Sequence, residues 1–163
     1  MKTFTIQPAA GSTDIGEVRQ LFTEYAESLG FSLCFQGFDR ELAELPGKYA
    51  GPAGRLLLAR SGEETAGCVA LRPLAPDIGE MKRLYVRPPF RGQGLGRLLA
   101  EAIAAEALEA GYRWVYLDTL PRMQEAIPLY RSMGFTEIPP YYANPVEGAV
   151  FMRLEVQRTA GRR

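Results

Sequence analysis

The sequence predicts a single α/β domain with a mixed central β-sheet of about six to seven strands flanked by about four helices. Short alternating or β-branched runs, typical of strands, are interspersed with longer runs that have the apolar period of helices. The segment 80–119 follows the order strand, glycine-rich turn, helix, strand, which predicts a parallel strand pair with a right-handed crossover. We find no internal repeat, low-complexity tract or linker, so one domain is expected over residues 1–158, followed by a short polar tail, 159–163.

The first half of the chain predicts one strand, two helices and a β-hairpin. Asp14, with Glu17 three residues later, is expected to cap the first helix, whose apolar face ends at Gly30. Glu24 and Glu27 lie off that face and are expected to be solvated. The expected bounds are 3–7 for the strand, 14–30 and 38–45 for the helices, and 54–60 and 65–71 for the hairpin, which Pro73 and Pro76 close.

The second half predicts a central strand, two helices and three further strands. A proline pair at 88–89 ends the central strand before the glycine-rich turn. Pro128 falls inside the second helix and is expected to kink it. The expected bounds are 80–86, 114–119, 136–138 and 149–156 for the strands and 95–110 and 123–133 for the helices.

The glycine-rich turn has the sequence RGQGLGR, from Arg91 to Arg97, and is typical of an anion site. Gly92, Gly94 and Gly96 permit positive φ and a close approach of the backbone to a ligand. Amides in the first helical turn have no internal partner, so they attract phosphate oxygens, and the flanking arginines add charge. A Rossmann fingerprint would need glycine at position 97, and a P-loop would need Gly-Lys-Ser/Thr, so neither nucleotide motif fits.

The composition excludes several classes of function. Nineteen Lys and Arg residues balance nineteen Asp and Glu residues, so neither nucleic acid nor a membrane is expected as a partner. There is no histidine, and Cys34 and Cys68 lie far apart, so no metal site is predicted and both thiols are expected to be small apolar groups. A general base must then be Glu, Asp, Tyr, Cys or water. Without a signal-like N-terminus or a long apolar run, the protein is expected to be cytoplasmic.

Three features together point to a known family. The turn fits the pattern Arg-x-x-Gly-x-Gly, residues 126–135 fit Ala-x-x-Leu-Tyr-x-x-x-Gly-Phe, and the strand at 80–86 precedes the turn. With the order of the predicted elements, these features resemble the GNAT superfamily of acyl-CoA-dependent N-acetyltransferases over nearly the whole chain. The resemblance implies the GNAT fold, in which the strands at 80–86 and 114–119 splay apart and the pantetheine arm of acetyl-CoA enters the gap.

The resemblance also implies which residues bind acetyl-CoA. Backbone groups of Leu84, Tyr85 and Val86 would bind pantetheine, and one of their amides would hold the thioester oxygen. The pyrophosphate would lie on the turn, whose residues are Arg91, Gly92, Gln93, Gly94, Leu95, Gly96 and Arg97. Many members carry an asparagine where this chain has Met123, so that pantetheine contact is not expected here.

Two residues are expected to move protons. By resemblance, Tyr130 would protonate the departing CoA thiolate; a phenol pKa near 10 against about 8.5 for a thiol makes the transfer mildly uphill. Glu80 would deprotonate the amine through water, with a pKa raised by burial. The alternatives are a core tyrosine with a paired hydroxyl at 130 and a solvated or salt-bridged glutamate at 80, beside Lys82 and Arg83.

The loop 139–145 is expected to cover the amine substrate. Its aromatic pair, Tyr141 and Tyr142, is flanked by prolines and is suited to hold an amine by packing or cation–π contact, together with Asn144. The alternative is a packed turn with no ligand.

The expected function is direct transfer of an acetyl group from acetyl-CoA to a primary amine of a small molecule. Acetylation of a protein N-terminus or lysine, a non-catalytic acyl-CoA-binding regulator, and a different phosphate-ligand enzyme remain alternatives. Dimers are common in the family, so a homodimer is one expected assembly, but no stretch of this sequence identifies an interface.

Overall fold

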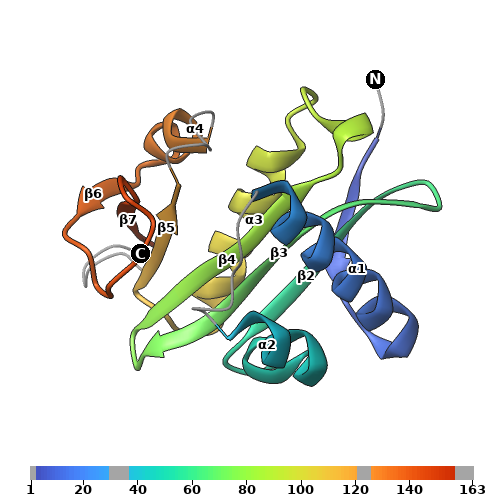
Figure 1. The fold of residues 1–163 in the computed structure, drawn as a ribbon, viewed down its shortest axis with the longest axis horizontal. Coiled ribbons are helices and arrows are strands. Elements are labelled where there is room, and N and C mark those ends of the chain that lie inside the picture. The colour runs from blue at the N-terminus through green and yellow to red at the C-terminus, as the bar shows by residue number, and fades with distance from the viewer. Residues whose placement is uncertain (1–2, 30–36, 121–125, 157–163) are drawn as a thin grey trace.

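A seven-stranded mixed β-sheet forms the centre of the fold (Figure 1), with strand order β1-β2-β3-β4-β5-β7-β6. The structure is a computed structural model, and it describes residues 3–29, 37–120 and 126–156. The strands are β1 (Thr5–Pro8), β2 (Arg55–Ser61), β3 (Glu64–Ala75), β4 (Ile78–Val86), β5 (Trp114–Thr119), β6 (Thr136–Ile138) and β7 (Val150–Glu155). All neighbours pair antiparallel except β4 and β5, which are parallel, as the strand-helix-strand order predicted.

Helices cover both faces of the sheet. One apolar core lies between the sheet and the helices α1 (Gly11–Leu29) and α2 (Phe38–Glu44). A second core lies on the opposite face, against α3 (Leu95–Glu109) and α4 (Ala126–Met133). Two short 3₁₀ helices, η2 (Gly47–Tyr49) and η3 (Pro88–Phe90), join α2 to β2 and β4 to the glycine-rich turn.

The two central strands separate soon after they begin to pair. The parallel register joins Ile78 to Trp114 and ends with the pair Glu80 and Tyr116, although β4 continues to Val86 and β5 to Thr119. The expected splay between these strands is therefore confirmed, and its apex lies at Glu80.

A β-bulge distorts β4 immediately beyond the apex. Val69 of β3 faces two residues of β4, because Cys68 pairs with Tyr85 while Ala70 pairs with Lys82. Within the bulge Arg83 has φ of 62°, a left-handed conformation that is uncommon for a residue with a Cβ. Such a conformation persists only where its surroundings hold it.

Contacts from α1 and α2 hold the bulge residue. The guanidinium of Arg83 is only 2% exposed and donates two hydrogen bonds to Glu41 of α2, at 2.8 and 2.9 Å. The same group lies 5.9 Å from the ring centre of Tyr25 and 5.3 Å from that of Phe38. The bulge thus ties both helices to the central strand.

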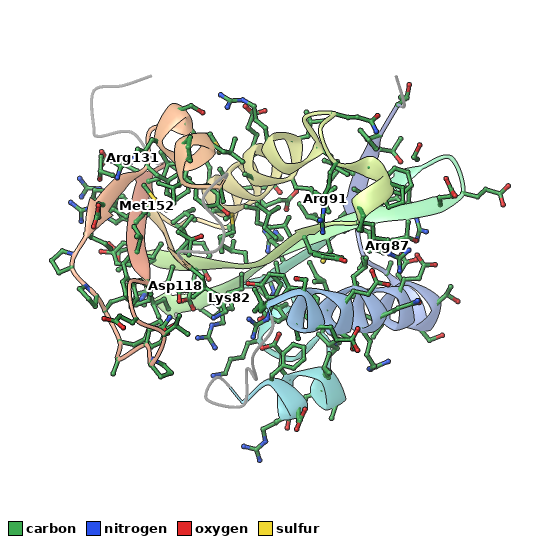
Figure 2. The ribbon with its side chains drawn as sticks, turned by 45° about the horizontal axis from the view of Figure 1, so that its top comes forward. Lys82, Arg87, Arg91, Asp118, Arg131 and Met152 are labelled. Carbon is green, nitrogen blue, oxygen red and sulfur yellow. The ribbon has the colours of Figure 1, made fainter. Side chains whose placement is uncertain are left out.

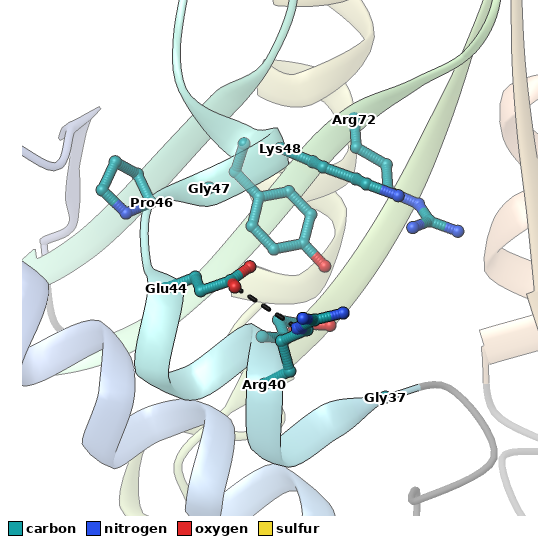
Figure 3. A pocket seen from close by; sticks show the side chains of 9 residues that line it. Gly37, Arg40, Glu44, Pro46, Gly47, Lys48 and Arg72 are labelled. Atoms are coloured by element: carbon teal, nitrogen blue, oxygen red, sulfur yellow. Dashed lines mark ion pairs between the residues drawn. The ribbon is translucent and has the colours of Figure 1, made fainter.

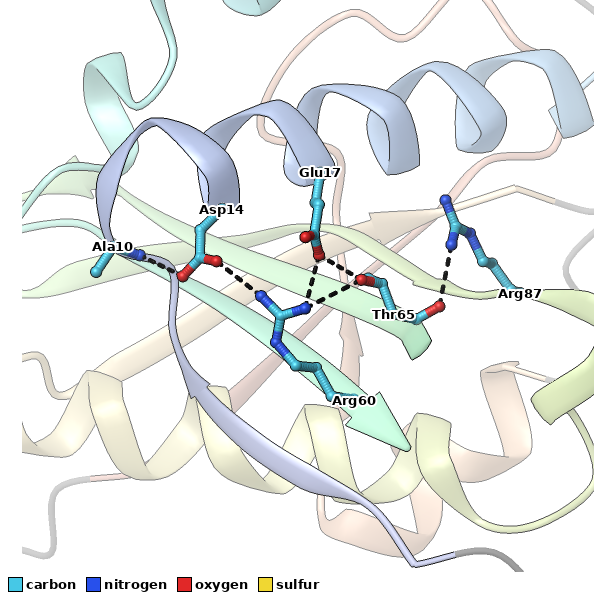
Figure 4. Close-up of polar contacts among 6 residues, drawn as sticks. All are labelled: Ala10, Asp14, Glu17, Arg60, Thr65 and Arg87. Atoms are coloured by element: carbon cyan, nitrogen blue, oxygen red, sulfur yellow. Dashed lines mark hydrogen bonds and ion pairs between the residues drawn. The ribbon is translucent and has the colours of Figure 1, made fainter. Parts of the chain in front are cut away.

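An ionic network fixes the start of α1 against the sheet (Figure 4). Arg60 of β2 donates to Asp14 at 2.7 Å and to Glu17 at 2.8 Å, and Thr65 of β3 also bonds Glu17. Asp14 does not occupy the expected N-cap position, because α1 begins three residues earlier, at Gly11. Its carboxylate instead accepts a bond from the amide of Ala10 at 2.9 Å.

Two other expectations differ from the structure. Glu24 is not simply solvated, because both its oxygens accept bonds from Arg87, at 3.0 and 2.9 Å. Pro73 does not end the hairpin strand, since β3 continues to Ala75. The kink expected at Pro128 stays a prediction, because residues 121–125, where that helix was expected to begin, lie outside the described residues.

Loss of the Arg60 network is expected to destabilise the fold. The side chains of Arg60 and Asp14 are 18% and 17% exposed, so Arg60→Ala leaves two half-buried carboxylates without their cation. We expect the free energy of unfolding in urea to fall by about 1–3 kcal/mol. The matched variant Arg131→Ala removes an ion pair whose partners are 56% and 58% exposed, and should change stability by less than about 0.5 kcal/mol. Equal losses of unfolding free energy in the two variants would contradict the claim that the Arg60 network stabilises α1 against the sheet.

Candidate active site

A groove of about 600 Å³ opens beside the splay and the glycine-rich turn. Nine of the ten predicted cofactor-binding residues line it: Leu84, Tyr85, Val86, Arg91, Gly92, Gly94, Leu95, Gly96 and Arg97. The tenth, Gln93, is not part of the lining. Sequence analysis missed the parts of the lining that come from other helices, among them Tyr25 and Ser28 of α1 and Ala126 and Leu129 of α4.

The glycine-rich turn has the backbone conformation that its composition predicted. Gly92 and Gly94 have φ of 76° and 83°, and Gly94 is the N-cap residue of α3. A side chain at either position would be strained by the backbone angle rather than by a clash. The first turn of α3 therefore presents its free amides to the groove.

The two arginines of the turn make different contacts. Arg91 donates from Nε to the carbonyl oxygen of Val86 at 2.8 Å. Arg97 donates to Ser132 of α4 at 2.7 Å and pairs with Glu101 at 3.1 Å, with its side chain 45% exposed. Both residues line the groove, so both can reach an anionic ligand there.

Val86 presents its backbone to the gap between β4 and β5. The amide of the next residue, Arg87, bonds Ala66 of β3 at 2.9 Å. Because backbone groups alternate along a strand, the amide and carbonyl of Val86 point to the opposite edge, away from β3. The carbonyl already accepts the bond from Arg91, so the Val86 amide is the group on this edge that can pair with an extended ligand, as a further strand would.

Tyr130 lies in the core beneath the splay. Its ring is 5% exposed and packs against Phe135, with 5.4 Å between ring centres. Its hydroxyl makes no hydrogen bond to another described residue. Burial, with Tyr25 and Asp118 nearby, raises the pKa of Tyr130 well above 10, so proton transfer to a thiolate is more uphill than expected.

Glu80 lies at the apex of the splay and is almost fully buried. Arg72 of β3 donates to one carboxylate oxygen at 2.9 Å, and Tyr141 donates to the other at 2.6 Å. Burial alone would raise the pKa of Glu80, but Lys82, the Tyr141 hydrogen bond and Arg72 together outweigh burial and lower it. The expectation of a raised pKa is therefore wrong, and Glu80 is held as a carboxylate.

The loop after β6 closes over the acidic residues at the splay, where Tyr141 contacts Glu80 and both Tyr142 and Asn144 contact Asp118. Tyr142 donates to Oδ2 of Asp118, and Asn144 donates to the same oxygen at 2.9 Å. The ring of Tyr141 packs edge-on against Tyr116 and Phe151 at 5.4 and 5.1 Å. The loop thus supplies both aromatic faces and hydroxyl groups to this end of the sheet.

Asp118 is a site residue that sequence analysis missed. Asp118 of β5 lies beyond the last paired residues of β4 and β5, and it is near enough to Lys82 of β4 to favour the charged form of that lysine (Figure 2). Only Oδ2 of Asp118 is hydrogen-bonded within the described residues, so Oδ1 keeps its acceptor capacity. Asp118 lies near the end of the alternating strand β5, and a polar residue at such a position was the one signal available.

Other predicted features have limited roles in this site. Cys68 is fully buried, and burial raises the pKa of its thiol, so it is not a reactive group. Cys34 and Met123 lie outside the described residues. Within the described ranges, His, Cys, Asp and Glu side chains form no group of three suited to a metal ion. None of the helices described there is long and apolar enough to cross a membrane.

The resemblance implied a groove with free helix-terminal amides beside two central strands that separate, and the structure has such a groove. A family model decides the assignment. The model of the Acetyltransferase (GNAT) family matches residues 17–135. The chain belongs to this family.

Relatives of this N-acetyltransferase are spread across distant organisms. It is 44% identical to an uncharacterized N-acetyltransferase of Schizosaccharomyces pombe, over 89% of this chain and 90% of the relative. It is 32% identical to the N-acetyltransferase YjgM of Escherichia coli, over 74% of this chain and 73% of the relative.

Solved structures share the fold of this acetyltransferase. The acetyltransferase yncA of Salmonella typhimurium, solved with its cofactor acetyl-CoA, has a TM-score of 0.72 at 20% identity and covers 96% of both chains. The ribosomal-protein-S18-alanine N-acetyltransferase of E. coli has a TM-score of 0.73 at 22% identity and covers 99% of both chains. The family assignment excludes an unrelated phosphate-ligand enzyme.

The ionised state of Glu80 gives a pH-dependent prediction. A carboxylate whose pKa is lowered in the folded state stabilises the fold above its unfolded pKa, about 4.3, and loses this contribution as pH falls through the folded pKa. The stability difference between wild type and Glu80→Gln in urea unfolding should therefore be constant from about pH 7 to 5.5 and shrink below about 4.3.

Asp39→Asn is a matched control for that experiment. Asp39 lies on the exposed side of α2, and its replacement should give a small difference at every pH. A Glu80→Gln difference that already shrinks between pH 7 and 5.5 would mean that Glu80 has a raised pKa, contrary to the contacts described above.

Proposed function

We propose that this enzyme transfers the acetyl group of acetyl-CoA directly to a primary amine of a small molecule. The observation that supports this most strongly is the juxtaposition of two half-sites at one splay. The groove and the outward-facing amide of Val86 lie on one side of the opening, and Asp118 with the tyrosine loop lies on the other. An acyl donor and an amine can then meet without an acyl-enzyme, so proximity supplies much of the rate.

The groove fits acetyl-CoA by size and chemistry. Free amides of α3 and the side chains of Arg91 and Arg97 would hold the pyrophosphate. The backbone of Leu84, Tyr85 and Val86 would pair with pantetheine. When bound, acetyl-CoA supplies the acetyl group as a reactive thioester.

The opposite half-site fits a cationic amine. Asp118 offers a carboxylate oxygen that accepts no hydrogen bond from another described residue. The rings of Tyr116, Tyr141 and Tyr142 lie around it, so both charge and aromatic faces favour an ammonium group. In the reaction an N–C bond replaces the C–S bond of the thioester. The ammonium loses two protons, of which one ends on the CoA thiol and the other leaves to solvent.

Tyr130 and Glu80 would act on these protons. Tyr130 holds its proton at neutral pH because its pKa is raised, so its hydroxyl would donate a hydrogen bond to the departing sulfur. Glu80 is ionised and reaches the surface through Tyr141, so it would attract a proton from the amine through that hydroxyl or a water molecule.

The experiment that tests the proposal measures release of free thiol from acetyl-CoA across a panel of small primary amines, peptides and lysine-bearing proteins. We expect turnover with small amines. In Tyr130→Phe, kcat should fall by about 10²-fold or more, because a general acid contributes about that factor, while CoA should still raise the melting temperature.

Tyr112→Phe is the matched control for the Tyr130 variant. The Tyr112 hydroxyl donates to Ala53 at 2.7 Å, away from the groove, so kcat should stay within about twofold of wild type. Turnover of proteins or peptides alone would replace the small-molecule assignment. A melting shift with CoA but no turnover of any amine would indicate a non-catalytic acyl-CoA-binding regulator.

A further inference from the structure

A second and smaller pocket lies beside Glu80, between α2, η2 and β3 (Figure 3). Its volume is about 150 Å³, against about 600 Å³ for the cofactor groove, so it has room for one small polar group. Its lining consists of Gly37, Arg40, Glu41, Glu44, Pro46, Gly47, Lys48, Tyr49 and Arg72. Arg72 connects the two sites, because it lines this pocket and also donates to Glu80.

The pocket has positive charge that its own carboxylates do not neutralise. Glu41 is bonded on both oxygens by Arg83, and Glu44 pairs with Arg40 at 3.4 Å. Arg72 uses only Nε, on Glu80, so both its terminal nitrogens lack a hydrogen bond within the described residues. The ammonium group of Lys48 likewise forms no ion pair with any described residue.

We propose that this anion pocket binds a carboxylate of the amine substrate, an inference that rests on the proposed function. The two terminal nitrogens of Arg72 form a planar fork that matches the two oxygens of a carboxylate. Lys48 adds a second cation on the same lining. Because Arg72 also donates to Glu80, the carboxylate of the substrate would be bound next to the proposed site of proton transfer.

The position of the pocket favours a substrate whose amine and carboxylate are well separated. The proposed ammonium site is at Asp118 of β5, whereas Arg72 lies on β3 and pairs in register with Glu80 of β4. Because β4 lies between β3 and β5, the backbones of Arg72 and Asp118 are at least two inter-strand spacings apart, roughly 10 Å at about 4.8 Å each. We therefore expect a substrate longer than an α-amino acid such as glycine, either an ω-amino acid or a dipeptide with free ends.

A chain-length series tests the inference. The substrates are glycine, β-alanine, γ-aminobutyrate, δ-aminovalerate, ε-aminocaproate and diglycine, each beside the n-alkylamine of matching length, at saturating acetyl-CoA. We expect kcat/KM to rise with length and to exceed that of the matched alkylamine roughly tenfold for δ-aminovalerate and ε-aminocaproate, as one charge-assisted interaction allows.

Variants separate the pocket from general electrostatic attraction. Lys48→Gln should raise KM for the favoured ω-amino acid by about tenfold and leave KM for the matched alkylamine within about twofold. Arg113→Gln removes an equally positive side chain that is also exposed but lies outside the pocket, and it should change neither value by more than about twofold.

Two results would overturn the inference while the proposed function stands. One is equal or better turnover of the alkylamines, and the other is a Lys48→Gln variant with unchanged KM for every ω-amino acid. A CoA melting shift without turnover of any amine would overturn the proposed function, and this inference with it.

Discussion

The parting of β4 from β5 beyond Glu80 and Tyr116 is the constraint on which the rest of the site depends. Strands inside a sheet normally pair along both edges, and unpaired backbone groups are costly unless water or a ligand satisfies them. Here the bulge at Arg83 turns β4 away, and Glu41 and Tyr25 hold that residue in its left-handed conformation. The fold thus maintains a gap that an extended ligand can fill with backbone-type hydrogen bonds.

The charges on the substrate face follow from the same geometry. Because the splay brings β3, β4, β5 and the loop after β6 to one point, Glu80 receives Arg72 from one side and Tyr141 from the other. These contacts keep it ionised despite burial, whereas Asp118 retains one oxygen without a partner in the described residues. In the function we propose, Asp118 faces the amine, and Glu80 connects this site to the cationic pocket through Arg72.

Local signals in the sequence predicted the order of the elements, the glycine-rich turn and the aromatic loop, because each depends on neighbouring residues. The resemblance added the splay. The bulge, the oxygen of Asp118 without a partner among the described residues, and the pocket around Arg72 were not predictable. Each depends on tertiary contacts that no local pattern encodes, such as the bond from Arg83 to Glu41, 42 positions away. The pKa of Glu80 was predicted in the wrong direction for the same reason: burial was foreseen, but the Tyr141 hydrogen bond, across 61 positions, was not.

Residue-resolved amide hydrogen exchange at Val86, with and without CoA, tests the central claim most directly. If the Val86 amide faces an open gap, it should exchange much faster than the amide of Arg87, which bonds Ala66, and saturating CoA should slow it at least about tenfold. An amide at Val86 already protected like that of Arg87 in the free protein, or one that CoA leaves unchanged, would contradict the claim that the gap between β4 and β5 is the cofactor site.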